Sequence, residues 1–280
     1  MRPRSLLSQN DKIPPNRRAG TLRAQEDGQP HRRRLGRSVF ILPSLFTVGN
    51  IFCGYYAIIA TVHGNYDHAA QAIGVAIILD SLDGKIARLT NSTSGFGLQL
   101  DSLADVISFG IAPSLLAFFW GAQNVDYGLG WIAAFTFTIC GAMRLARFNV
   151  QAGRFKHFVG LPIPAGGGTI AAIVHFFVNP VSTALGASLL ATTVFLLAFL
   201  MISTFRYNSF KHLTLGKRSH FTILVIALLV ALIYAYSRWT LLLLGLGYSL
   251  SGPAMRLYSL LRHRKRTIED PHLHEPLEDH

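Results

Sequence analysis

Long apolar segments constrain this chain more than any other feature of its sequence. Eight stretches of mostly uncharged residues approach the length of about 20 residues that a helix needs to cross a membrane. They cover residues 39–62, 69–88, 97–120, 128–148, 163–179, 185–205, 220–237 and 239–257. The short connection from Tyr236 to Trp239 allows either a hairpin between two spans or one long kinked segment. The sequence therefore predicts an all-α integral membrane protein, a polytopic bundle of about eight transmembrane helices.

The basic residues predict an orientation for these helices. Cytoplasmic loops collect Lys and Arg, and 25 of the 26 in this chain fall on one side if the eight spans alternate. The exception is Arg238, and the junctions 63–68, 121–127 and 179–184 contain no Lys or Arg. Both termini are therefore predicted to be cytoplasmic. The net charge of +12 then reflects topology and does not indicate nucleic acid, which would need a basic face exposed to water.

Three regions follow from this composition. Residues 1–38 are rich in Arg, Pro, Gln and Gly and predict a disordered, basic cytoplasmic arm. Residues 39–260 form the predicted membrane domain, and residues 261–280 form a cytoplasmic tail. The two cysteines, Cys53 and Cys140, both lie in apolar runs, which indicates buried, inert thiols rather than a disulfide framework or a zinc site.

Acidic residues are scarce in the apolar part of the chain. Only six lie between Gly28 and Ile268: Asp67, Asp80, Asp83, Asp101, Asp105 and Asp126. Asp67 and Asp126 fall in predicted external loops, whereas the other four lie within the second and third spans or at their cytoplasmic ends. An Asp at the centre of a membrane helix costs about 2.5–3.5 kcal/mol. Four such residues therefore need a compensating partner.

The spacing of the four acids predicts what that partner is. Asp80 and Asp83 share one helix face, as do Asp101 and Asp105. The short polar stretch 90–95 favours antiparallel neighbours, which would bring the four carboxylates into one pocket at the cytoplasmic face. A set of oxygen ligands suits Mg²⁺ or Mn²⁺ rather than zinc or copper, and two divalent ions would balance the four charges.

The four acids are also compatible with two roles that involve no bound metal cofactor. The first is a structural role in helix capping or helix pairing. The second is a cation or proton path through a transporter, which usually places its acids at the bilayer midplane in broken helices. Here the acids lie toward the predicted cytoplasmic edge, and neither span has a predicted Gly or Pro break at mid-depth.

The full pattern of the two spans resembles the signature of the CDP-alcohol phosphatidyltransferase family. It reads Asp80-x2-Asp83-Gly84-x2-Ala87-Arg88-x8-Gly97-x3-Asp101-x3-Asp105. Segments 42–50, 141–149 and 158–165 look like the branch that makes phosphatidylserine. The resemblance covers roughly residues 38 to 260.

The resemblance implies an activity and a set of roles. Members of the family transfer the phosphatidyl group of a CDP-linked lipid to an alcohol and release CMP. By resemblance, Asp80, Asp83, Asp101 and Asp105 hold Mg²⁺ or Mn²⁺, and Asp105 is also the general base. Residues expected to contact CDP-diacylglycerol are Gly84, Arg88, Gly97 and Asn50. Arg144 and Arg147 are a candidate clamp for the acceptor or for lipid phosphate.

L-serine is the acceptor that this resemblance favours. Glycerol 3-phosphate, choline or an inositol compound stay open, because Arg144, Arg147, Arg154 and Lys156 would also suit a phosphorylated acceptor. The resemblance further implies a homodimer. We expect a multi-pass protein of the cell inner membrane whose active site faces the cytoplasm.

Overall fold

The computed structural model describes residues 38–89, 95–151, 160–205, 207 and 219–269. The chain divides into Met1–Ser38 and Val39–His280, and the packing described below belongs to the second unit. Within the described residues every regular element is a helix, so the predicted all-α class is confirmed.

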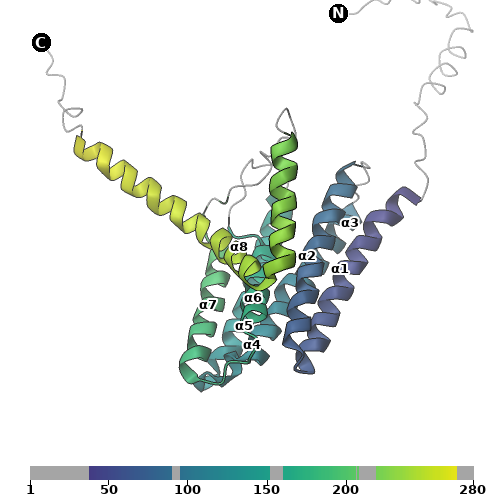
Figure 1. Ribbon diagram of the computed structural model, residues 1–280, viewed down its shortest axis with the longest axis horizontal. Helices are drawn as coiled ribbons and strands as arrows, with labels where there is room; N and C mark the ends of the chain where they lie inside the picture. Colours follow the sequence, from purple (N-terminus) through teal and green to yellow (C-terminus); the bar gives the residue numbers. More distant parts are fainter. Residues whose placement is uncertain (1–37, 90–94, 152–159, 206, 208–218, 270–280) are drawn as a thin grey trace, which may run out of the picture. The chain divides into compact units, whose positions relative to one another are not determined.

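Figure 1 labels the helices, which follow one another along the chain from α1 to α8. The α-helices are α1 (Ser38–Val62), α2 (Tyr66–Leu89), α3 (Gly95–Asp105), α4 (Ala112–Trp120), α5 (Leu129–Gln151), α6 (Ile163–Phe176), α7 (Ala184–Ile202) and α8 (Ser219–Glu269). A π-helix, η1 (Val106–Ile111), joins α3 to α4, and two short 3₁₀ turns, η2 (Ala122–Asn124) and η3 (Asp126–Gly128), precede α5. All the predicted helical segments overlap these elements.

Five helical segments of the described chain are long and apolar enough to cross a membrane. They are Leu45–Val62, Gly95–Trp120, Asp126–Val150, Ala184–Ile202 and Val230–Arg256. The apolar helix α6 has only 14 residues, which corresponds to about 21 Å and falls short of a hydrocarbon core of about 30 Å. Helix α2 is not among the five segments, because its C-terminal half contains charged residues that lower its mean hydropathy.

Small residues on α6 allow this helix to pack closely among its neighbours. α6 contacts α2, α4, η1 and α8, while α5 packs along α7. A Cβ at Gly167 would lie 2.8 Å from the carbonyl oxygen of Phe109, so only glycine permits this approach of α6 to η1. Phe109, Phe137 and Ile163 are fully buried at the centre of the resulting core.

The π-helix corrects the prediction of a regular helix over residues 97–120. η1 begins directly after Asp105, so the helical turn widens at mid-span, and the expectation that this span has no Gly or Pro break at mid-depth was wrong. Pro113 explains part of the change, because a proline has no N–H to donate to the carbonyl of Phe109 one turn before it. Such π segments occur frequently at functional sites.

Helix α8 is broken at Tyr236, whose backbone angles of φ −137° and ψ 49° are not helical. Figure 1 shows the two arms of α8, green and yellow, meeting at an angle. The Thr240 hydroxyl on the second arm donates a hydrogen bond of 3.2 Å to the Leu232 carbonyl on the first. The sequence allows a hairpin between two spans or one long kinked segment, and the structure shows a single helical element with a sharp break at Tyr236.

The second arm of α8 is held by the segment that follows α7. The Tyr207 hydroxyl donates to the Ser249 carbonyl at 3.0 Å, and the Tyr207 ring lies against Gly252, where any side chain would collide. Burial, and to a lesser degree the neighbouring Tyr248, raises the pKa of Tyr207 to about 12. The phenol therefore stays protonated and remains a donor.

Candidate functional site

Three of the four predicted aspartates meet where α2 lies beside the α3–η1 helix. Asp80 of α2 and Asp101 and Asp105 of α3 each offer a carboxylate oxygen, and these oxygens lie within 4.8 Å of one another. Asp105 is the last residue of α3, and its side chain is buried. The regular turns of α3 place Asp101 and Asp105 on one face, as their spacing predicted.

Asp83 has a different environment from the other three. It is buried, and its carboxylate accepts a short hydrogen bond from the hydroxyl of Thr47 on α1. It remains close enough to Asp80 and Asp101 for its charge to act on both. The structure thus brings three predicted ligands together and places the fourth at the edge of the cluster, against α1.

Asn50 of α1 lies beside Asp105. Its carbonyl accepts a hydrogen bond of 2.9 Å from Ser108 of η1, which fixes α1 against the π-helix. Gly54 makes this contact possible, because a Cβ there would collide with Ser108. The Asn50 side chain is close enough to interact with the Asp105 carboxylate, yet neither its amide atoms nor Asp105 Oδ1 has a hydrogen bond of ordinary geometry.

Arg144 of α5 adds a positive charge beside the aspartate cluster. It lies close enough to Asp105 for the two charges to attract, and Arg147 lies near Arg144 on the same helix. The Arg144 Nε atom is buried without a hydrogen-bond partner. Asn149, further along α5, donates a hydrogen bond of 2.9 Å to the Ser102 hydroxyl. This bond joins the end of α5 to α3.

The remaining predicted site residues lie on the same helices. Gly84 is exposed on α2, next to Asp83, and Gly97 is half-buried in the first turn of α3. Arg88 is in the last turn of α2, and its side chain is outside the part that the structure describes. Arg154 and Lys156 also lie outside the described residues.

The donor set fits a hard divalent cation. Three carboxylates held this close in an apolar bundle repel one another and lose the hydration that would stabilise their charges. Every ligand atom is oxygen, which is the preference of Mg²⁺ and Mn²⁺. The buried Asp105 Oδ1 without a hydrogen bond is the kind of atom that a bound cation would satisfy.

Sequence reasoning assigned no role to Thr47, which the structure places at the site. A signal was present, because Thr47 and Asn50 are three residues apart and Gly54 is four further on, a polar and small stripe on one face of an apolar helix. The prediction for Asp67 was wrong. It lies in the first turn of α2 rather than in a loop, and it pairs with His175 of α6.

Comparison with known proteins points to one family. The family profile described as CDP-alcohol phosphatidyltransferase matches residues 40–196. This match begins within α1 and ends within α7, and it includes all the aspartates of the cluster.

Curated relatives carry related names. A protein of Helicobacter pylori strain ATCC 700392 / 26695 named CDP-diacylglycerol–serine O-phosphatidyltransferase is 35% identical over 227 residues, which cover 73% of this chain and 93% of that protein. A Bacillus subtilis strain 168 protein of the same name is 35% identical over 61% of this chain and 91% of its own length. An archaetidylserine synthase of Methanothermobacter thermautotrophicus is 36% identical over 61% of this chain and 70% of its own length.

Proposed function

Because the chain belongs to the CDP-alcohol phosphatidyltransferase family, a family of membrane phosphotransferases, we propose that it makes phosphatidylserine. In this reaction the phosphatidyl group of CDP-diacylglycerol passes to the hydroxyl of L-serine, and CMP leaves. The observation that carries the proposal is the convergence of Asp80, Asp101 and Asp105 beside Arg144. The names of the relatives support serine as the acceptor and CDP-diacylglycerol as the donor.

Asp80, Asp101 and Asp105 would hold Mg²⁺ or Mn²⁺, with Asp83 as a fourth ligand and two ions in the complete site. When bound, such ions would offset the negative charge of the diphosphate and polarise the phosphorus. Thr47 supports this arrangement because its hydroxyl fixes the orientation of the Asp83 carboxylate. A small change of conformation at Asp83 would free an oxygen for a cation.

Asp105 is the proposed general base. An ionised carboxylate has two oxygens that accept protons or ligands, so one can face a cation while the other receives the proton of the serine hydroxyl. The serine oxygen then attacks the phosphorus next to diacylglycerol, and the bond to CMP breaks. Burial of Asp105 keeps bulk water, a competing acceptor, away from the reacting atoms.

Arg144 is the proposed clamp for the acceptor, with Arg147 assisting. The serine carboxylate matches the planar fork of a guanidinium group, and the buried Nε of Arg144 has no partner to give up. The attraction between Arg144 and Asp105 would place the bound serine next to its base. A phosphate-bearing acceptor such as glycerol 3-phosphate would use the same groups.

The donor would lie along α1, α2 and α3. Asn50 presents its amide toward Asp105 and would contact the CDP part of the lipid. Gly84 and Gly97 leave room for the nucleotide near the backbone, and Arg88 would bind a phosphate oxygen. These assignments rest on their match to the family signature and on their position on the helices that carry the cluster.

The proposed setting is the cell inner membrane, with eight spans, both termini in the cytoplasm and the active site facing the cytoplasm. The distribution of Lys and Arg supports this orientation. The membrane domain would cover residues 39–260, with the basic arm 1–38 before it and the tail 261–280 after it. A homodimer is the assembly expected from the family, and light scattering on the purified protein would test it.

The direct test is a reconstituted assay. Purified protein is incubated with CDP-diacylglycerol, Mg²⁺ or Mn²⁺, and in turn L-serine, glycerol 3-phosphate, choline and inositol, while CMP and the new lipid are measured. We expect release of CMP that requires both lipid and L-serine and that stops on chelation of the metal. A folded, metal-supplied protein that yields no product with any alcohol would contradict the proposal.

One variant tests the role of the base. Asp105→Asn removes the proton acceptor and one ligand charge while keeping size, so we expect turnover to fall at least about 100-fold. Asp126→Asn makes the same chemical change at an exposed acid in η3, and it should keep full activity. Binding of CDP-diacylglycerol, measured on both variants, should change much less than turnover in Asp105→Asn. Full activity in Asp105→Asn would remove this residue from the chemistry.

A further inference from the structure

A second polar cluster joins three helices far from the aspartates. Asp67 lies in the first turn of α2, His175 in the last turn of α6, and Ser237 directly after the break in α8. Asp67 and Asp80 are 13 residues apart on α2, which places the two clusters about 20 Å apart along that helix. The second cluster is therefore separate from the proposed transferase site.

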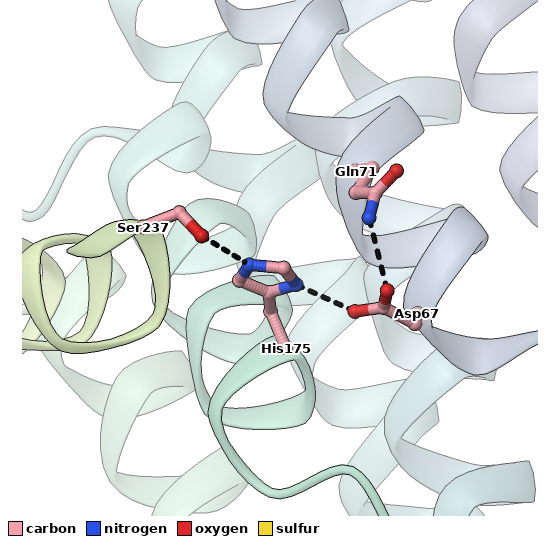
Figure 2. Close-up of polar contacts among 4 residues, drawn as sticks. All are labelled: Asp67, Gln71, His175 and Ser237. Atoms are coloured by element: carbon pink, nitrogen blue, oxygen red, sulfur yellow. Dashed lines mark hydrogen bonds and ion pairs between the residues drawn. The ribbon is translucent and has the colours of Figure 1, made fainter. Parts of the chain in front are cut away.

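The contacts of this cluster have a defined order, which Figure 2 shows. His175 Nδ1 lies 2.5 Å from Asp67 Oδ1, and His175 Nε2 lies 3.1 Å from Ser237 Oγ. Gln71 donates a hydrogen bond of 2.9 Å to the second oxygen of Asp67. An ionised carboxylate only accepts, so His175 donates its Nδ1 proton to Asp67, and in the tautomer with a single proton on Nδ1 the Nε2 lone pair faces the serine hydroxyl.

Ser237 differs from most other helical hydroxyls of the described chain. Thr61, Ser81 and Thr192, for example, each donate to a carbonyl of their own helix one turn earlier. The Ser237 hydroxyl instead meets a ring nitrogen on another helix. A hydroxyl satisfied by its own backbone needs no histidine, so the contact with His175 indicates a role beyond local hydrogen bonding.

The surroundings of Ser237 and His175 also suit a reacting group. Tyr236, the residue before Ser237, has non-helical backbone angles, so Ser237 stands at the break between the two arms of α8. The side chain of His175 is only 11% exposed, whereas that of Asp67 is 42% exposed. The imidazole ring is therefore largely buried, and the carboxylate next to it is accessible.

We propose that Ser237 is a nucleophile activated by His175 and oriented through Asp67, forming a site for carboxylic esters with an apolar chain. The order of hydroxyl, imidazole and carboxylate, with both distances near hydrogen-bond length, is the arrangement that activates serine in hydrolases on unrelated folds. Gln71 is the fourth residue of this cluster, and its hydrogen bond fixes the orientation of the Asp67 carboxylate. This activity is independent of phosphatidyl transfer.

Aromatic side chains next to the cluster define the class of substrate. The rings of Phe176 and Trp239 lie 4.6 Å apart, and Phe176 and Phe177 lie 4.8 Å apart, each edge to face. Phe176 and Trp239 lie within two residues of His175 and Ser237 in the chain, and Phe177 and Trp239 are more than half exposed. An acyl chain would pack on this aromatic surface while its ester carbonyl faces Ser237.

The proposed reaction is an ester hydrolysis whose only further reactant is water. Ser237 Oγ attacks the ester carbonyl carbon while His175 Nε2 takes the hydroxyl proton. The ester bond breaks, the alcohol leaves with that proton, and an acyl group remains on Ser237. Water then attacks the acyl carbon, His175 takes one proton from the water and returns it to Ser237 Oγ, and a carboxylic acid leaves.

The test uses the full chain in lipid nanodiscs and a fluorophosphonate probe with an alkyl chain. The serine oxygen displaces fluoride from phosphorus, and the adduct is located by mass spectrometry of the peptides. We expect one adduct on Ser237, absent in Ser237→Ala and formed at least about 10-fold more slowly in Asp67→Asn. Asp105→Asn should keep normal labelling, because it belongs to the other site.

A second measurement uses turnover of p-nitrophenyl butyrate, which should be lost in Ser237→Ala. Size-exclusion chromatography shows that Ser237→Ala is folded, so this variant decides the question even if a His175 variant fails to fold. The proposal is overturned if folded wild-type protein forms no adduct on Ser237, or if labelling is unchanged in Asp67→Asn. The three residues would then be only a contact between helices.

Discussion

The buried carboxylate of Asp83 accepts a hydrogen bond from a hydroxyl on another helix. Thr47 of α1 supplies that hydrogen bond, and it also joins α1 to the helix that carries Asp80. Because burial removes water as an alternative partner, the state of Asp83 is sensitive to this one side chain. Thr47, which is not part of the family signature, therefore influences the conformation of an aspartate that is.

Thr47→Val is predicted to be harmful although it keeps the size of the side chain. The change leaves the Asp83 carboxylate without its donor, which costs about 1–3 kcal/mol. We expect a lower melting temperature and at least about 10-fold weaker CMP release. Thr47→Ser restores the hydroxyl and should recover most of both values. Equal loss in the Val and Ser variants would show that the methyl packing of Thr47 matters rather than its hydrogen bond.

Metal binding at the aspartates should be visible without turnover. A ligand that binds only the folded protein stabilises it by about 2.7 kcal/mol at 100 times its dissociation constant. We expect Mn²⁺ to raise the melting temperature of the wild-type protein and to have little effect on Asp101→Asn. The exposed-site control Asp126→Asn should respond as the wild type does. An identical shift in Asp101→Asn would place the ion elsewhere.

At the scale of elements, the junction of α3 and α4 positions the base. η1 follows Asp105 directly, and both α1 and α6 approach it closely, at Ser108 and at the Phe109 carbonyl. The π-helix η1 is therefore packed between α1 and α6. Since Asp105 is the last residue before it, packing on η1 controls the direction of that carboxylate.

Gly167→Ala tests this support. The added Cβ would lie 2.8 Å from the Phe109 carbonyl oxygen and 3.1 Å from Pro113, both parts of a rigid helix that cannot move aside. Overpacking of this kind costs about 1–3 kcal/mol, and we expect reduced stability with a parallel fall in activity. Gly74→Ala is the matched control, because its Cβ meets nothing within 4 Å and alanine favours a helix. Full activity of Gly167→Ala would show that the packing of α6 on η1 does not affect catalysis.

At the scale of the whole molecule, the proposed topology separates the two polar clusters. The aspartates of the transferase site lie toward the C-terminal end of α2, and Asp67 lies in its first turn. If α2 crosses the membrane, the two clusters face opposite sides. The excess of basic residues in alternate connections supports the cytoplasmic side for the transferase cluster.

Single cysteines can test this orientation in intact cells. Asn65, Gln123 and Lys85 are exposed, and the native Cys53 and Cys140 would first be replaced. We expect a membrane-impermeant maleimide to label Asn65→Cys and Gln123→Cys in whole cells, and Lys85→Cys only after permeabilisation. Labelling of all three without permeabilisation, or the reverse pattern, would refute the topology.

The sequence by itself determined the helical class, the positions of the helices and the membership of Asp80, Asp101 and Asp105 in one cluster. These properties are local, because apolar length, charge and i, i+3 or i, i+4 spacing act within one or two neighbouring helices. Asp80, Asp101 and Asp105 come from helices adjacent in the chain, so a short connection was enough to predict their meeting.

Only the tertiary structure decided which distant helices touch. Thr47 with Asp83, Gly167 with Phe109, and His175 with Asp67 and Ser237 join residues that no local pattern relates. The π-helix after Asp105 is also decided by packing as well as by Pro113. The physical reason is that the faces of apolar helices look alike in sequence, and the choice among them depends on the close packing of all the helices at once.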